Sequence, residues 1–159
     1  MHRRVTHFAA ALEHAGGRAQ VRELEASTRT ARDAAAALGC SVGAIANSLV
    51  FMSDGQPILV LSSGAHRVDT EFVAAVIRAK EVRPATPDEV RLATGQPIGG
   101  VAPLGHPAPL PTYIDRTLRD FETIWAAAGT PHAVFPTSFA ELQRITEGTA
   151  IEVVSARPE

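Results

Sequence analysis

The sequence predicts a single domain of the α+β class. Short apolar runs and helix-like segments alternate irregularly along the chain, an apparent β-hairpin occurs early, and no βα unit repeats. A repeated βα unit would be typical of a doubly wound parallel sheet, so its absence favours α+β. The length of 159 residues suits one domain, and 45% hydrophobic with 20% charged residues is close to the globular average.

The N-terminal quarter is predicted to hold two helices and a strand. Phe8 and Leu12 lie four residues apart and indicate a helix over about 6–15, which a Gly-Gly pair ends. A short strand is expected over 20–24. The alanine-rich segment 30–38, stopped by a glycine, is expected to form the second helix.

The clearest local signal is the hairpin. Apolar runs at 44–52 and 57–61 flank a Ser-Asp-Gly-Gln segment, and an Asp-Gly pair between two such runs is typical of a tight β-turn. Further along, Pro and Gly residues make 96–111 incompatible with a continuous helix or a central strand.

Capping residues mark the remaining helices. Asp69 is expected to cap one helix, and Thr86, followed by Pro87, to cap another that Gly95 ends. The other expected elements are a strand at 80–83, an extended segment at 111–114, a helical turn capped by Asp115, an extended or helical segment at 121–125, a strand at 132–135, a helix from Ser138 to about 145 and a strand at 150–154.

The basic residues are unusual, because 14 of the 15 are Arg and only Lys80 is Lys. Chemistry that needs a lysine ammonium must therefore use Lys80 or do without it. The net charge of -2 excludes a histone-like nucleic-acid binder. Residues 1–32 are nonetheless net basic, and this segment is either a phosphate contact or a solvated helix face.

Metal, disulfide and membrane signals are weak. A single cysteine, Cys40, cannot form an internal disulfide or a multi-cysteine zinc site, and no His pair has ligand spacing on a helix face. We therefore expect no metal and no cofactor. No apolar run approaches 18 residues, so we expect no membrane span and a cytoplasmic protein.

The loop Gly99–Pro103 is the most unusual stretch. Consecutive glycines permit positive φ and close backbone approach, so their N–H groups can converge on one oxygen atom. No Gly-Lys-Ser/Thr follows, which excludes a P-loop. Composition alone leaves open whether this loop cradles a ligand or is a plain turn.

Four motifs in order identify a family resemblance. They are Cys40-x4-Ile45-Ala46-Asn47-Ser48-Leu49-Val50-Phe51, Ser63-Gly64-x-x-Arg67-Val68-Asp69, Thr94-Gly95-x-x-Ile98-Gly99-Gly100-Val101-Ala102-Pro103-Leu104-Gly105 and Ala127-Ala128-Gly129-x-Pro131-His132. Together they resemble the YbaK/prolyl-tRNA synthetase-associated domain family over about 25–154, with a basic helical segment 1–24 before it. The resemblance implies a compact α+β domain with a curved, barrel-like mixed sheet flanked by helices. It also implies a trans-editing hydrolase that removes wrongly attached amino acids from tRNA.

The resemblance assigns roles to particular residues. Gly99 and Pro103 match the family's Gly-x-x-x-Pro loop, in which the backbone amides, here those of Gly99, Gly100 and Val101, are expected to hold the 3′-terminal adenosine and the ester carbonyl. His132 corresponds to a histidine that lines the amino-acid pocket in some members. Further expected substrate contacts within the matching motifs are Ser48, Arg67 and Asp69.

One position departs from the family pattern. Where the strand motif usually has lysine, this chain has Asn47, which keeps a hydrogen-bond donor and loses the permanent charge. Three hypotheses follow: the domain hydrolyses aminoacyl-tRNA without the ammonium, it acts on another acyl ester, or it binds tRNA acceptor ends or a nucleotide-like ligand without catalysis. The implied partners are the 3′ end of aminoacyl-tRNA and a synthetase, with the protein a monomer or a homodimer.

Overall fold

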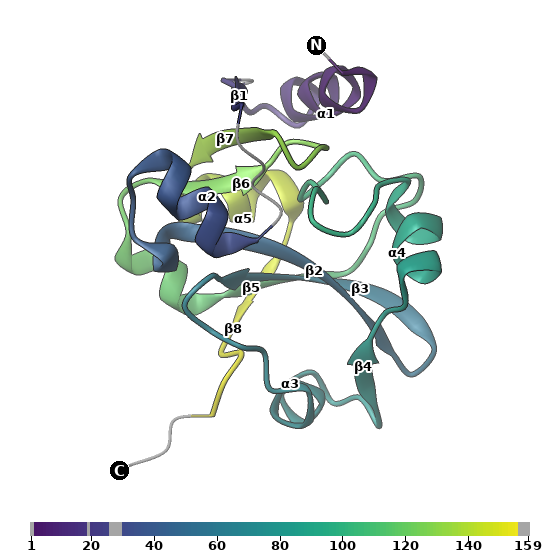
Figure 1. Cartoon of the computed structure of the whole chain (residues 1–159). Coiled ribbons are helices and arrows are strands. Elements are labelled where there is room, and N and C mark those ends of the chain that lie inside the picture. The colour runs from purple at the N-terminus through teal and green to yellow at the C-terminus, as the bar shows by residue number, and fades with distance from the viewer. Residues whose placement is uncertain (1, 19, 26–29, 156–159) are drawn as a thin grey trace.

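Figure 1 shows the computed structural model of the chain, which describes residues 2–18, 20–25 and 30–155. The helices are α1 (Arg3–His14), α2 (Ala31–Leu38), α3 (Thr70–Ile77), α4 (Pro87–Thr94) and α5 (Phe139–Thr146), with 3-10 turns η1 (Val42–Ala44) and η2 (Arg116–Asp120). The strands are β1 (Arg22–Glu23), β2 (Ile45–Ser53), β3 (Gln56–Ser63), β4 (Val82–Pro84), β5 (Thr112–Asp115), β6 (Ile124–Ala127), β7 (Ala133–Thr137) and β8 (Thr149–Ile151). Within the described ranges, no helix is long and apolar enough to cross a membrane.

The eight described strands form one mixed sheet, which confirms the α+β prediction. The order is β1-β7-β6-β2-β3-β5-β8, and β4 pairs with β2 beside this path. The hairpin β2–β3 is antiparallel, whereas β6 runs parallel to β2, and β5 runs parallel to both β3 and β8. The sheet has β1 and β8 as edges and is not closed.

Local capping explains where the helices begin and end. Thr86 and Glu89 form a reciprocal capping box at the start of α4, and Gly95 ends this helix with a left-handed φ of 72°. The Asp69 carboxylate accepts a hydrogen bond from the Phe72 N–H at 3.1 Å and so caps α3. These caps agree with the sequence predictions.

The core lies on both faces of the central strand β3. Leu59 and Leu61 pack into one cluster with α1 and α5, whereas Ile58 and Val60 pack into a second cluster with α3. This alternation follows from the two-residue period of a strand. Helices therefore cover both faces, with α1 at one end of the molecule and α3 with β4 at the other (Figure 1).

The basic N-terminal helix is part of the main core. The side chains of Val5, Phe8 and Leu12 are buried, and the Phe8 ring lies 4.8 Å from that of Phe135 in β7. The Arg4 Nε donates to the Gly129 carbonyl at 3.0 Å. Of the arginines in the net basic segment 1–32, Arg29 lies outside the described residues.

Two expected strands are shorter than predicted. The strand expected at 20–24 is only Arg22–Glu23, a two-residue edge strand on β7. The strand expected at 150–154 ends at Ile151, because the chain then leaves β5 and the Val153 carbonyl accepts the Asp69 N–H at 2.9 Å. The segment expected to be extended or helical at 121–125 overlaps β6 only at the first two residues of β6, because this strand runs Ile124–Ala127.

Candidate functional site

The candidate site begins at a gap along one edge of β2. On the side opposite β3, β6 pairs with Ile45 and Ala46, and β4 pairs with Phe51 to Ser53. Between them, no described strand covers 47–50. The Val50 carbonyl at one end of this gap accepts the Ala85 N–H at 3.1 Å, which shortens the open stretch to 47–49. Backbone groups left unpaired along a strand edge can bind a ligand, so this gap is a natural binding edge.

A cavity of about 740 Å³ lies against this edge. Its lining residues come from the start of α2, from β2, from the loop after β3, from the end of β4 and from the loop after α4: Thr30, Ala31, Asn47, Ser48, Leu49, Val50, Phe51, His66, Arg67, Val68, Thr70, Pro84, Ala85, Val90, Ile98, Gly99 and Val101. Five consecutive β2 residues take part because the cavity faces the strand edge and not one face of the strand. The volume lies in the range of small-molecule and cofactor sites.

A smaller cavity of about 30 Å³ adjoins the first, and the residues that line both are Thr30, Ala31, Asn47, Ser48, Gly99 and Val101. Its remaining walls are mostly apolar. The residues that line only this pocket are Ala34, Ile45, Ala46, Trp125, Ala127 and Val134. Such a recess suits a small side chain attached to a larger ligand in the main cavity.

The structure brings together five of the residues that the sequence suggested: Asn47, Ser48, Arg67, Gly99 and Val101 line the main cavity. The other four lie elsewhere. Gly100 is buried within the loop against Thr130 and Pro131, Pro103 lines a separate surface pocket, Asp69 caps α3, and His132 has an exposed side chain just before β7.

The glycine loop is held rigidly against the protein. Gly99 has φ of 93°, a region that favours glycine, and a Cβ on Gly100 would lie 2.8 Å from the Thr130 carbonyl carbon. Inside the loop, the buried Gln96 Oε1 accepts the Ala102 N–H at 2.7 Å. Burial lowers the pKa of His106, whose Nε2 donates to the Ala102 carbonyl at 2.8 Å.

Two polar side chains project from the open edge. Asn47 and Ser48 are half-buried, and Ser48 Oγ is buried without a hydrogen-bond partner among the described residues. A buried hydroxyl left unpaired costs about 1–3 kcal/mol, so a ligand oxygen or nitrogen that reached it would remove that cost. Lys80 is exposed and does not line the cavity, so it does not replace the lysine absent at Asn47.

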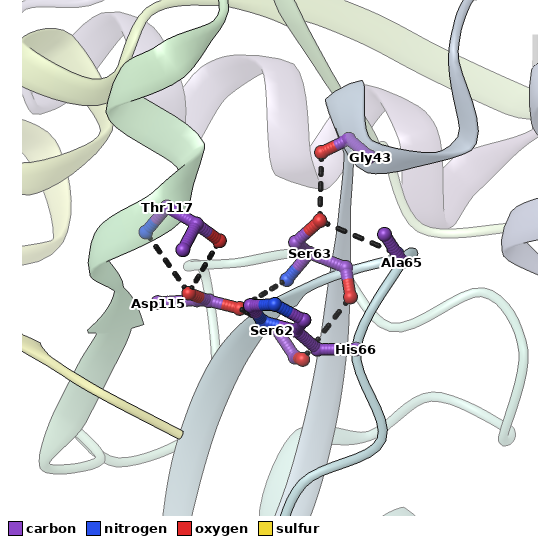
Figure 2. A network of polar contacts seen from close by, with 7 residues as sticks. All are labelled: Gly43, Ser62, Ser63, Ala65, His66, Asp115 and Thr117. Atoms are coloured by element: carbon purple, nitrogen blue, oxygen red, sulfur yellow. Dashed lines mark hydrogen bonds and ion pairs between the residues drawn. The ribbon is translucent and has the colours of Figure 1, made fainter. Parts of the chain in front are cut away.

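A histidine on the cavity wall is fixed by a buried carboxylate. The His66 Nδ1 lies 2.8 Å from Asp115 Oδ2, and Asp115, at the end of β5, is 0% exposed (Figure 2). The same carboxylate accepts the Ser63 N–H at 2.9 Å and the Thr117 N–H and Oγ1 at 3.0 and 2.8 Å.

Sequence reasoning predicted that Asp115 would cap a helical turn, which its bond to Thr117 confirms, but it missed the contact with His66. The two residues lie 49 positions apart, so only the pairing of β3 with β5 brings them together. Within the described residues, no three His, Cys, Asp or Glu side chains cluster as metal ligands would.

The fold and the cavity define a class: a small α+β domain with a ligand cleft between a strand edge and a glycine loop. The chain belongs to the aminoacyl-tRNA editing domain family, whose model matches residues 25–145. This family match agrees with the YbaK-type resemblance of the four sequence motifs.

Individual relatives cover different shares of the chain. The uncharacterized protein YwhH of Bacillus subtilis is 33% identical over 127 residues, which span 79% of this chain and 80% of YwhH. The proline–tRNA ligase of Solidesulfovibrio magneticus is 36% identical over 90 residues, or 56% of this chain but only 15% of the ligase. A crystal structure of a proposed trans-editing enzyme for prolyl tRNA synthetase superposes with a TM-score of 0.90 at 40% identity, covering 98% of this chain and 99% of that one.

Proposed function

We propose that this protein is a trans-editing hydrolase that removes a wrongly attached amino acid from aminoacyl-tRNA. The observation that carries the proposal is the main cavity, in which the open edge of β2 faces Gly99 and Val101. In this arrangement the 3′-terminal adenosine occupies the main cavity, and the attached amino acid points into the small adjoining pocket.

The glycine loop supplies the electrostatic part of the reaction. Water attacks the ester carbonyl, and the backbone N–H groups of Gly99 and Val101, which line the cavity, polarise that carbonyl and stabilise the negative charge on its oxygen. The third expected donor, the Gly100 N–H, is buried and donates to the Pro97 carbonyl at 3.4 Å, so it supports the shape of the loop. A rigid loop suits this role because its dipoles need no reorganisation during the reaction. The tight packing of Gly100 against Thr130 provides that rigidity.

The polar residues on the cavity wall orient the substrate. Asn47 and the unpartnered hydroxyl of Ser48 hydrogen-bond the terminal nucleotide or the ester, and the exposed Arg67 pairs with a backbone phosphate. The mainly apolar walls of the small pocket admit a small amino-acid side chain and exclude bulky ones.

A second function is favoured by one residue. Asn47 stands where the family pattern has lysine, so the cavity lacks the ammonium that would stabilise developing charge. Without it, the domain would bind a tRNA acceptor end or a nucleotide-like ligand and leave the ester intact. A synthetase is a proposed partner in either case, because relatives of this domain occur within proline–tRNA ligases.

A deacylation panel separates the two functions. Purified protein is mixed with tRNAs charged with Ala, Cys, Ser or Thr, alongside the Asn47→Lys and Gly99→Ala variants. The hydrolase function predicts release of at least one amino acid by the wild type and its loss in Gly99→Ala. Retention of charged tRNA with no release by either the wild type or Asn47→Lys supports the binding module and contradicts the hydrolase.

Gly55→Ala is the matched control for Gly99→Ala. Gly55 has φ of 83° in the β2–β3 turn, and a Cβ there meets nothing within 4 Å. Both substitutions therefore carry the conformational strain of a positive φ, about 1–2 kcal/mol, but only Gly99 lines the cavity. If both variants lose the same stability but only Gly99→Ala loses deacylation, the glycine loop is part of the site.

A further inference from the structure

One side chain on the cavity wall has the chemistry of a base. Of the described residues that line the cavity, His66 and Arg67 alone have titratable side chains. A guanidinium remains protonated in proteins and cannot act as a base. Protein-assisted removal of a proton from water in this cavity therefore falls to the imidazole of His66.

The contact with Asp115 determines which nitrogen of that imidazole is basic. A carboxylate has about four acceptor positions, and Asp115 fills them with donors: the Ser63 and Thr117 N–H groups, the Thr117 hydroxyl and His66 Nδ1. Since this carboxylate only accepts, Nδ1 carries the proton and Nε2 carries the free lone pair. Within the part of the chain that the structure describes, Nε2 has no hydrogen-bond partner.

The segment that carries His66 is fixed before any ligand binds. The His66 N–H donates to the Ser63 carbonyl at 2.9 Å, and the Ser63 hydroxyl donates to the Gly43 carbonyl at 2.8 Å and accepts the Ala65 N–H at 3.3 Å (Figure 2). The side chain of His66 nevertheless keeps 25% of its surface exposed, so it is accessible from the cavity.

We propose that His66 is the general base of the hydrolytic reaction and that Asp115 is its positioning residue, an inference that rests on the proposed deacylase function. His66 Nε2 takes a proton from water as the water oxygen bonds to the ester carbonyl carbon. The glycine-loop amides bind the resulting oxyanion. When the bond from carbon to the ribose oxygen breaks, the imidazolium returns the proton to that oxygen, and the amino acid and the uncharged tRNA leave.

This assignment explains how the site works without lysine at Asn47. A lysine ammonium would stabilise charge but would not take a proton from water while it stays protonated. Here the loop amides stabilise charge and a neutral imidazole supplies the base. The alternative role for His66 is purely structural, as a clamp between the loop after β3 and Asp115.

Single-turnover kinetics of His66→Gln separate these roles. The best substrate of the Ala, Cys, Ser and Thr panel is used with saturating protein, and tRNA binding and the melting temperature are measured for each variant. We expect a loss of about 10²- to 10⁴-fold in the rate constant with less than about 3-fold change in tRNA affinity. His14→Gln, an exposed histidine at the end of α1, is the matched control and should keep the wild-type rate.

The pH profile of the wild type tests the same role without any substitution. The charged groups placed beside the imidazole are the carboxylate of Asp115 and, on the cavity wall, the guanidinium of Arg67. After subtraction of spontaneous hydrolysis, a reaction that needs an unprotonated base should show a rate constant that rises with pH and then levels off. Asp115→Asn should lower that plateau, because an amide can stabilise the other tautomer of the ring.

The outcomes are distinct. Deacylation by His66→Gln within about 3-fold of the wild type, or a wild-type rate that is flat with pH, would overturn the assignment of the base and leave the deacylase function intact. An equal loss of tRNA affinity and rate, with a lowered melting temperature, would also overturn it in favour of the structural clamp. Failure of the wild type to hydrolyse any of the four substrates would overturn both proposals.

Discussion

Substituting Gly100 by Ala tests whether the glycine loop is pressed against the β6–β7 connection. A Cβ on Gly100 would lie 2.8 Å from the Thr130 carbonyl carbon, 2.9 Å from the Pro131 nitrogen and 3.0 Å from Pro131 Cδ. Two of these three atoms are backbone, so the loop itself must shift. Overpacking of this kind costs about 1–3 kcal/mol. For a chain of 159 residues, a loss of about 2 kcal/mol lowers the melting temperature by about 4–8 °C.

The assay combines thermal unfolding, followed by circular dichroism, with single-turnover deacylation. A shift of the loop amides away from the ester carbonyl should lower the rate constant by about 10- to 100-fold. Gly43→Ala is the comparison, because its Cβ would meet the end of the Phe121 ring at 2.7 Å, a side chain that can move aside. A melting temperature for Gly100→Ala within 1 °C of the wild type would refute the tight contact on which the rigid-loop argument depends.

Three further predictions concern stability. Asp115→Ala should lower the free energy of unfolding by about 3 kcal/mol or more in denaturant titrations, because the buried Ser63 N–H and the half-buried Thr117 N–H lose their acceptor; a loss under 1 kcal/mol would contradict this. Phe8→Ala should cost about 3–5 kcal/mol in the same titration if α1 is part of the core, whereas a peripheral helix would show little change. Hydrogen bonds from Arg83 and from the Thr86 N–H lower the pKa of the Glu89 carboxyl to about 2 from its usual 4.5. The extra stability of the wild type relative to Glu89→Gln should therefore be complete above about pH 4.5 and should disappear as the pH falls towards 2. A difference between these two proteins that is unchanged from pH 7 to pH 2 would contradict that linkage.

Features that depend on neighbouring residues were predictable from the sequence. The Asp54-Gly55 turn identified the β2–β3 hairpin, and the caps of α3 and α4 lie within three residues of the amides they bind. The two shortened strands show the limit of this reasoning, since β1 and β8 are edges whose lengths depend on their partner strands.

The site was predictable only in part, because it depends on long-range pairing. The motif residues Asn47 and Gly99 do line one cavity, but the gap that creates the cavity exists because β6 and β4 pair with opposite ends of β2. Likewise His66 and Asp115 meet through the pairing of β3 with β5. Neither strand pairing produces a local sequence pattern near His66 or Asp115. From the sequence, Asp115 is therefore explained as a cap alone, and its contacts with His66 and Ser63 are visible only in the structure.

The measurement that tests the central claim most directly is the rate at which saturating protein hydrolyses the ester of Ala-charged tRNA. A trans-editing hydrolase with a loop that stabilises the oxyanion and a positioned base should release alanine about 100-fold or more faster than buffer alone. The small pocket, with walls such as Ala34, Ala127 and Val134, makes alanine a suitable first substrate. Charged tRNA that is retained by the protein, while its ester decays at the rate in buffer, would contradict the account and identify a binding module.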